Sequence, residues 1–277
     1  MLKRLLVFLL WFSPGLIDAA NLPKVVPHLD VRGHAAYQDF LAATPPRAFA
    51  LAPGGSHAWV SEAASDEAAA EQALEDCSRQ SEQTCVLFAV NRKSVFDARR
   101  WSGLWGPYAD ATASARAPVG MRRGMRFPNL ALTDAAGNKV SLSDLRGRLL
   151  VLHFWGSWCP HCRLEMPGLQ RLARQFGKEK VAFALVQVRE DAASARAWLR
   201  QQKIALPLYD SGARGPRDAA LPLAGGGTLA DREIARAFPS TYVLSRHGVV
   251  LFSHTGPIQD WSQYADFLRH AAHATNP

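Results

Sequence analysis

Apolar runs of strand length recur through the second half of the chain, and stretches with helical periodicity separate them. The runs lie at 148–154, 181–188, 240–244 and 249–252. The helical stretches run from Cys162 to about Phe176 and then cover 191–202 and 264–273. Gly248 lies in a short turn between the last two runs, which predicts a hairpin. Strands that alternate with helices and end in a hairpin indicate an α/β sheet with helices on both faces.

The first part of the chain predicts a smaller α+β unit. Its strands are expected at 48–51, 58–60 and 85–90. A Pro-Gly-Gly turn joins the first two as a hairpin. Ser65 or Asp66 can cap an Ala- and Glu-rich helix that runs to about Arg79.

A change of composition separates these two regions. Residues 110–117 read DATASARA, without a large apolar side chain, and Pro and Gly follow them. This stretch predicts a linker over 110–124, between a small domain at 21–109 and a larger domain at 125–277.

Residues 1–20 have the pattern of a secretory signal peptide. Lys3 and Arg4 precede an apolar run at 5–12, and small residues near Ala20 offer a cleavage site. A helix of that length spans about 12 Å, well short of the ~30 Å hydrocarbon core, so no stable membrane insertion is predicted. We expect an exported protein, in the bacterial periplasm, where disulfides persist. Whether the segment is cleaved stays open.

The composition is that of a folded globular protein, with 48% hydrophobic and 20% charged residues. The net charge of +8 comes from 32 Lys and Arg against 24 Asp and Glu. The basic residues are scattered, and the densest group lies at 122–126. This pattern is typical of a solvated surface and predicts no nucleic-acid binding.

Two of the four cysteines predict a structural disulfide. Cys77 lies at the end of the predicted helix and Cys85 at the start of the following strand, so a bond between them would pin the helix to the sheet. Their spacing matches neither a redox nor a metal motif. In the chain-entropy model, closing so short a loop contributes about 2.6 kcal/mol.

The other two cysteines form a Cys-Pro-His-Cys motif, in which a predicted strand meets a predicted helix. A helix N-terminus offers unpaired N–H groups and a positive dipole end, which stabilise a thiolate. We expect Cys159 on an exposed lip as the attacking thiol and Cys162, one turn inward, as the resolving thiol. Pro160 suits the first helical turn, and His161 adds positive charge beside Cys159 when protonated.

Other uses of this cysteine pair fit the sequence less well. Zinc would need two more soft ligands, but the remaining cysteines lie about 75 residues away, so no metal is predicted. A c-type haem would need His where Arg163 stands. A purely structural disulfide remains an alternative, although so small a ring is typical of reactive pairs.

Residues 154–167, FWGSWCPHCRLEMP, resemble the active-site segment of thioredoxin-fold proteins, most closely the exported TlpA/ResA-like thiol-disulfide oxidoreductases. The resemblance covers about 125–273 and implies a thioredoxin-like fold. Pro167 matches the helix-kinking proline of that fold. Glu165 matches an acidic residue that is associated with proton handling at the resolving cysteine.

The resemblance also implies a substrate-binding edge. Pro239 lies where the fold places a cis-proline, a rare form of the peptide bond. Phe238 and Pro239, together with Trp158, are implied to contact the extended chain of the substrate. An ordinary trans-proline that opens a strand is the alternative reading of Pro239. The segment 211–230 is interpreted as an enlarged, mobile surface loop near this edge.

His153 departs from the pattern, because thioredoxin has a buried acid there and the exported relatives often have Asn. As a strand residue beneath the motif, it either shuttles the proton of Cys162 or is a neutral core histidine with a hydrogen-bonded partner. The sequence leaves both alternatives open.

The resemblance implies chemistry on protein thiols and disulfides without a cofactor. The TlpA/ResA-like proteins are mostly reductants that a membrane reductase supplies with electrons, which implies a membrane redox partner. The Cys-Pro-His-Cys motif instead matches the oxidant DsbA, because a stabilised thiolate makes the disulfide a stronger oxidant. The motif favours an oxidant or isomerase, but the direction stays open. The rival hypothesis, a partner-binding scaffold with a non-essential thioredoxin-like platform, leaves the intact Cys159, Cys162 and Pro239 without a role.

Overall fold

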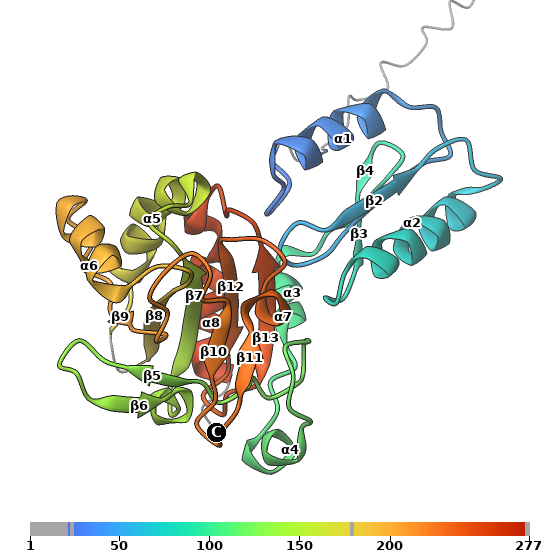
Figure 1. Cartoon of the computed structure of the whole chain (residues 1–277). Coiled ribbons are helices and arrows are strands. Elements are labelled where there is room, and N and C mark those ends of the chain that lie inside the picture. The colour runs from blue at the N-terminus through green and yellow to red at the C-terminus, as the bar shows by residue number, and fades with distance from the viewer. Residues whose placement is uncertain (1–21, 23–24, 178–179, 275–277) are drawn as a thin grey trace, which may run out of the picture.

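The computed structural model describes residue 22, residues 25–177 and residues 180–274. Two sheets dominate it, each with its own helices, and they lie side by side in Figure 1. The predicted signal peptide at 1–20 falls outside the described residues. Within the described part of the chain, no helix is both long enough and apolar enough to cross a membrane.

The amino-terminal sheet has four strands in the order β2-β1-β3-β4. They are β1 (Ala48–Leu51), β2 (His57–Val60), β3 (Val86–Val90) and β4 (Lys93–Ser94). Helix α1 (Val31–Ala42) covers one face through aromatic residues such as Tyr37 and Phe40. Helix α2 (Asp66–Gln80) covers the other face through Ala69, Ala73 and Cys77, whose small side chains let it approach the strands closely.

Helix α2 is fixed at both ends. The Ser65 hydroxyl accepts a hydrogen bond from the backbone N–H of Ala68, 3.2 Å away, which caps the first turn. At the other end, a disulfide joins Cys77 to Cys85, immediately before β3.

The carboxy-terminal sheet has five strands in the order β13-β12-β7-β8-β9. They are β7 (Leu149–Trp155), β8 (Val181–Gln187), β9 (Leu208–Tyr209), β12 (Ser240–Leu244) and β13 (Val250–Thr255). Strands β7, β8 and β9 are parallel, whereas β12 and β13 form the predicted antiparallel hairpin. Every residue of β7 is buried, because both faces of this central strand are covered. The predicted α/β fold is confirmed.

The helices of this half cover mainly one face of the sheet. That face packs against α5 (Pro160–Ala173), α6 (Ala192–Gln201) and α8 (Ala265–Ala274). The other face packs against the hairpins β5–β6 (Ala131–Thr133, Lys139–Ser141) and β10–β11 (Ala220–Pro222, Thr228–Ala230) and the single-turn helix α7 (Asp231–Ile234). Helices were expected on both faces, but α7 is the one α-helix that covers the second face among the described residues.

The segment 211–230 contains the β10–β11 hairpin, which corrects the interpretation of the whole segment as a mobile surface loop. Its glycines form the turn, and Gly226 and Gly227 have positive φ angles. Leu221 is buried beneath the sheet, which anchors the hairpin.

The connection between the two sheets is ordered. It contains α3 (Ala98–Trp101), a 3-10 turn (Ser102–Trp105) and α4 (Ala111–Arg116), which the Asp110 side chain caps. Trp105 is fully buried, and its ring stacks on Phe267 of α8 with 4.0 Å between ring centroids. The Gln83 side chain donates a hydrogen bond to the Leu251 carbonyl across the two halves.

Candidate active site

The Cys-Pro-His-Cys motif lies where β7 ends and α5 begins. Cys159 is the N-cap residue of α5, and Pro160 occupies the first helical position, where a missing N–H leaves no donor unpaired. The Cys162 backbone N–H donates to Cys159 Sγ over 3.3 Å. Both cysteines are free thiols, and the helix start directs a donor and its positive dipole end at the first sulfur.

Cys159 is less accessible than the sequence suggested. Only 4% of it is exposed, because the loop before β12 covers the sulfur and the Phe238 carbonyl accepts its S–H at 3.5 Å. The Phe238–Pro239 peptide bond is cis, as in the resembling fold. Its neighbours in the sequence are more exposed: 47% of Trp158 is exposed, and His161 is exposed as well.

Cys162 is fully buried beneath Cys159. Burial raises the pKa of the Cys162 thiol, and the hydrogen bond with Cys159 and the charge of Glu165 act in the same direction. The two thiols therefore lie in different environments: the outer one caps a helix, and the inner one is held protonated.

Glu165 is a buried carboxyl group one helical turn after Cys162. Its Oε2 accepts a hydrogen bond from the Ile258 backbone N–H, 2.7 Å away. Burial outweighs that bond and raises the pKa of Glu165 to about 8. Side chains three positions apart on a helix are neighbours, so this carboxyl group can exchange a proton with Cys162.

His153 lies in the middle of β7 and faces Glu165. Its Nε2 is 3.4 Å from Glu165 Oε1, and its Nδ1 is 2.9 Å from the Thr241 hydroxyl in β12. Burial lowers the pKa of His153 to about 3, so the imidazole is neutral at physiological pH. The ring is therefore a neutral neighbour of Glu165, and its hydrogen-bonded partner is Thr241.

Several residues around the motif were not anticipated from the sequence. The Ser157 backbone N–H and hydroxyl both donate to Glu190, over 2.6 and 2.5 Å. Arg189 pairs with the buried Asp231 and also lies 5.8 Å from the centre of the Phe238 ring. Because β8 runs parallel to β7, its following residues meet the motif at the same sheet edge, and that rule could have identified Arg189 and Glu190.

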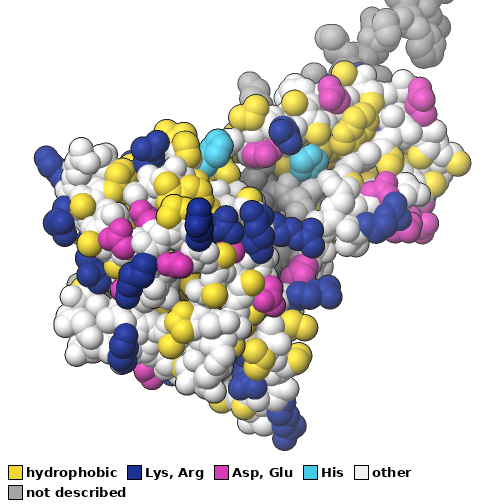
Figure 2. Space-filling model, in the orientation of Figure 1, with side chains coloured by type: hydrophobic (Ala, Val, Ile, Leu, Met, Phe, Trp, Pro, Cys, Tyr) yellow, Lys and Arg dark blue, Asp and Glu magenta, His cyan; other side chains and the backbone are white. Residues whose placement is uncertain are grey.

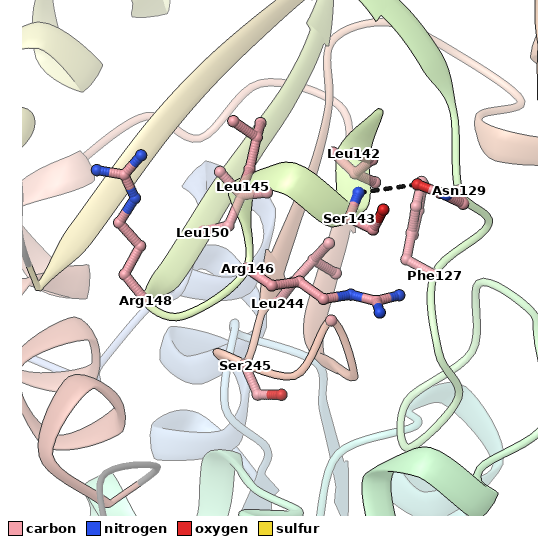
Figure 3. Close-up of a pocket in the computed structure, with 11 residues that line it drawn as sticks. Phe127, Asn129, Leu142, Ser143, Leu145, Arg146, Arg148, Leu150, Leu244 and Ser245 are labelled. Atoms are coloured by element: carbon pink, nitrogen blue, oxygen red, sulfur yellow. Dashed lines mark hydrogen bonds between the residues drawn. The ribbon is translucent and has the colours of Figure 1, made fainter. Parts of the chain in front are cut away.

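A further pocket lies far from the dithiol. Figure 3 shows it at the opposite end of β7, with Leu150 and Leu145 on one side and Phe127 and Asn129 on the other. None of the residues that line this pocket belongs to the cysteine site. Among the described residues, no group of His, Cys, Asp or Glu side chains is arranged to hold a metal ion.

The Redoxin family model matches residues 122–268, which is more than half of the chain and includes every residue of this site. The chain belongs to the Redoxin family. Curated proteins of similar sequence include the thioredoxin-like protein YneN of Bacillus subtilis, which is 27% identical over 140 residues, 50% of this chain and 74% of YneN. The thiol-disulfide oxidoreductase ResA of Bacillus subtilis is 27% identical over 150 residues, 52% of this chain and 73% of ResA. The predicted ResA-like resemblance is confirmed.

Solved structures similar to the Redoxin part cover about half of the chain. A putative thiol:disulfide interchange protein DsbE from Chlorobium tepidum is 22% identical, with a TM-score of 0.44 over 57% of this chain and 100% of that chain. StoA from Bacillus subtilis is 19% identical, with a TM-score of 0.39 over 51% of this chain and 98% of that chain. The Redoxin family match begins at residue 122 and does not include the amino-terminal sheet.

Proposed function

We propose that this protein is a thiol-disulfide oxidoreductase that acts on cysteines of other proteins through Cys159 and Cys162. One observation carries the proposal: Cys159 Sγ caps α5 at 3.3 Å from the Cys162 N–H, while the Phe238 carbonyl lies 3.5 Å away on the other side. A helix start stabilises a thiolate, and the neighbouring loop offers a backbone edge for a peptide that carries the second sulfur.

In the reductive direction, the Cys159 thiolate attacks one sulfur of a substrate disulfide, and the other sulfur leaves as a thiolate. Cys162 then loses its proton and attacks Cys159 Sγ, which releases the second substrate thiol. The substrate gains two electrons, and Cys159 and Cys162 become a disulfide. The same steps in reverse oxidise a substrate dithiol, and neither direction requires a cofactor.

In its ionised form, Glu165 takes up the Cys162 proton in this scheme. A pKa of about 8 places its carboxyl group close to the range in which thiols exchange protons, which is the condition for efficient general acid–base catalysis. His153, which stays neutral, positions Glu165 from the other side through the 3.4 Å approach to Oε1. Phe238, Pro239 and the exposed Trp158 form the edge along which the substrate chain lies.

The proposal also covers the cellular location of the protein and the direction in which electrons flow. Export to an oxidising compartment follows from the pattern of residues 1–20, and the ResA-like resemblance favours a membrane redox partner. The Cys-Pro-His-Cys motif, with His161 on the exposed first turn, favours an oxidant or isomerase.

The equilibrium reduction potential of the Cys159/Cys162 pair in a glutathione series decides the direction. A value above about −150 mV supports an oxidant or isomerase, whereas a value below about −220 mV indicates a reductant with a membrane electron donor. The Cys77–Cys85 disulfide stays oxidised throughout.

A trapping experiment tests the activity itself. With Cys162→Ser, attack by Cys159 stops at the mixed disulfide, so periplasmic proteins should accumulate as covalent adducts that dithiothreitol releases. The Cys159→Ser variant is the matched control and should trap none. Full biological function of Cys159→Ser would instead favour the partner-binding scaffold.

A further inference from the structure

Three exposed arginines lie on the two segments that approach Cys159, the start of α5 and the segment that leads to Phe238. Arg163 follows Cys162 on α5, and Arg232 and Arg236 lie in α7 and the loop that leads to Phe238. All three side chains are exposed, and none forms an ion pair with another described residue. We call these three residues the arginine surface.

Covalent connections place the arginine surface near the reacting sulfur. Arg236 precedes Phe238 by two residues, and the Phe238 carbonyl oxygen is 3.5 Å from Cys159 Sγ. Two residues of chain span at most about 7 Å. Arg232 Nη1 donates to the Arg236 carbonyl at 3.5 Å, so the Arg232 guanidinium group lies against the backbone of the same loop.

The carboxylates nearby are mostly engaged in other contacts. Asp231 is buried against Arg189, and Glu190 is buried against Ser157. Glu233 is exposed and offsets one positive charge, although it also accepts the Ala230 backbone N–H. On the Phe238 side of the entrance, Arg232 and Arg236 therefore outnumber the exposed Glu233, and that side keeps a net positive charge.

The surface view also shows basic side chains gathered in this region. In Figure 2, a cluster of hydrophobic side chains lies beside α5, and a row of Lys and Arg side chains runs from its edge toward the amino-terminal sheet. Few acidic side chains interrupt that row. A basic row beside an apolar patch suits a peptide with both apolar and acidic residues.

We propose that the arginine surface selects protein substrates that carry acidic residues within two or three positions of the reacting cysteine. The inference rests on the proposed oxidoreductase function and names its substrate class. A substrate strand that pairs with the Phe238 backbone rises about 3.3 Å per residue, so its second residue from the cysteine lies opposite Arg236. Arginine binds carboxylates with two parallel hydrogen bonds, and a positive entrance raises the encounter rate of anionic chains.

Three peptides of equal length test this selection. Each has one cysteine blocked as a mixed disulfide with 2-mercaptoethanol, which is uncharged, and each has Asp, Ser or Lys residues on both sides of that cysteine. The reduced full-length protein is mixed with each peptide, and the second-order rate constant of reduction is read by acid quench and mass spectrometry.

We expect the acidic peptide to react about tenfold faster than the basic one at low salt, with the neutral peptide between them. The difference should shrink at about 1 M salt, where the Debye length falls to about 3 Å. The Arg232→Glu/Arg236→Glu variant should reverse the order of the three peptides. The control Arg99→Glu changes an arginine whose side chain is 92% exposed in the other half of the molecule, and it should keep the wild-type order.

Equal rates for the three wild-type peptides would overturn the selection while leaving the oxidoreductase proposal intact. So would an unchanged order in the double variant. A lack of reaction with all three peptides would contradict the oxidoreductase proposal, and the selection with it.

Discussion

At the scale of single residues, the site depends on two buried groups that both remain uncharged. Burial raises the pKa of Glu165 to about 8 and lowers that of His153 to about 3, so the 3.4 Å contact between them is not an ion pair at neutral pH. Both shifts have the same cause, because a low-dielectric interior disfavours either charge. Only the ionised form of Glu165 can take up the Cys162 proton, and its share grows as the pH approaches 8.

Replacing Glu165 should change how stability depends on pH. The folded pKa of about 8 lies above the ordinary value of 4.5 for a glutamate, so between these pH values the folded state keeps a proton that the unfolded state has lost. Stability should therefore fall as the pH rises through this window, by at most about 1.4 kcal/mol per pH unit. Glu165→Gln removes that contribution and should flatten the curve.

Urea unfolding of both proteins from pH 5 to pH 8 measures this difference. The contributions of the buried histidines are common to both proteins and cancel in the comparison. Identical slopes would contradict the raised pKa of Glu165.

His161 is expected to adjust the potential of the dithiol. His161 lies on the first turn of α5, two residues after Cys159, where positive charge stabilises a thiolate and with it the reduced form. His161→Ser should lower the reduction potential by about 10–20 mV at low salt. His273→Ser, on the exposed end of α8, is the control and should leave the potential unchanged. A shift that persists unchanged at about 1 M salt would argue against an electrostatic cause.

At the scale of elements, the two halves of the chain hold their helices by different means. Helix α5 begins with the reactive sulfur as its cap, so its start serves the chemistry as well as the helix. Helix α2 begins with an ordinary Ser65 cap and ends at a disulfide, so its ends serve stability.

Removing the structural disulfide should weaken the amino-terminal sheet and spare the dithiol. The Cys77→Ser/Cys85→Ser variant frees a loop with a sequence separation of 8 residues, and the chain-entropy model predicts a loss of about 2.6 kcal/mol. Hydrogen exchange in α2 and β3 should rise, while the potential of Cys159 and Cys162 should stay at the wild-type value. A changed potential would show that the disulfide exchanges with the active dithiol.

At the scale of the whole molecule, the carboxy-terminal core includes a side chain from before the predicted linker. Trp105 packs on Phe267 and Phe252, and His28 contacts its ring with 5.0 Å between centroids. The segment after β13 also touches both halves: Ile258 binds Glu165, and Gln263 accepts the His28 backbone N–H at 2.6 Å. The division into domains at 21–109 and 125–277 stays a prediction. Removing one of these contacts tests whether the two halves unfold together or separately.

Trp105→Ala should destabilise the molecule as a whole. Truncating a fully buried tryptophan costs about 3–5 kcal/mol, and this one joins residues from both sides of the connection. Calorimetry should show a single lowered transition if the two sheets unfold together, and a lowered and an unchanged transition if they are independent domains. Trp158→Ala, at a site that is 47% exposed, is the matched control and should lose much less.

The sequence by itself determined the elements and the reactive pair. The strands at β7, β8, β12 and β13, the cap of α2 and the position of Cys159 at the start of α5 were all predictable, because each depends on a pattern within about fifteen residues. Helix α1, which has a glycine in its first turn, and the hairpin β10–β11, whose short strands flank a glycine-rich turn, were not predicted.

Only the tertiary structure decided the environment of the dithiol. His153 meets Thr241 across 88 residues of sequence, and Glu165 meets Ile258 across 93. Such contacts depend on strand register and loop packing, which no local pattern encodes. The same packing buried Cys159 under the Phe238 loop, against expectation, and gave Glu165 and His153 opposite pKa shifts from a single cause, the loss of water around them.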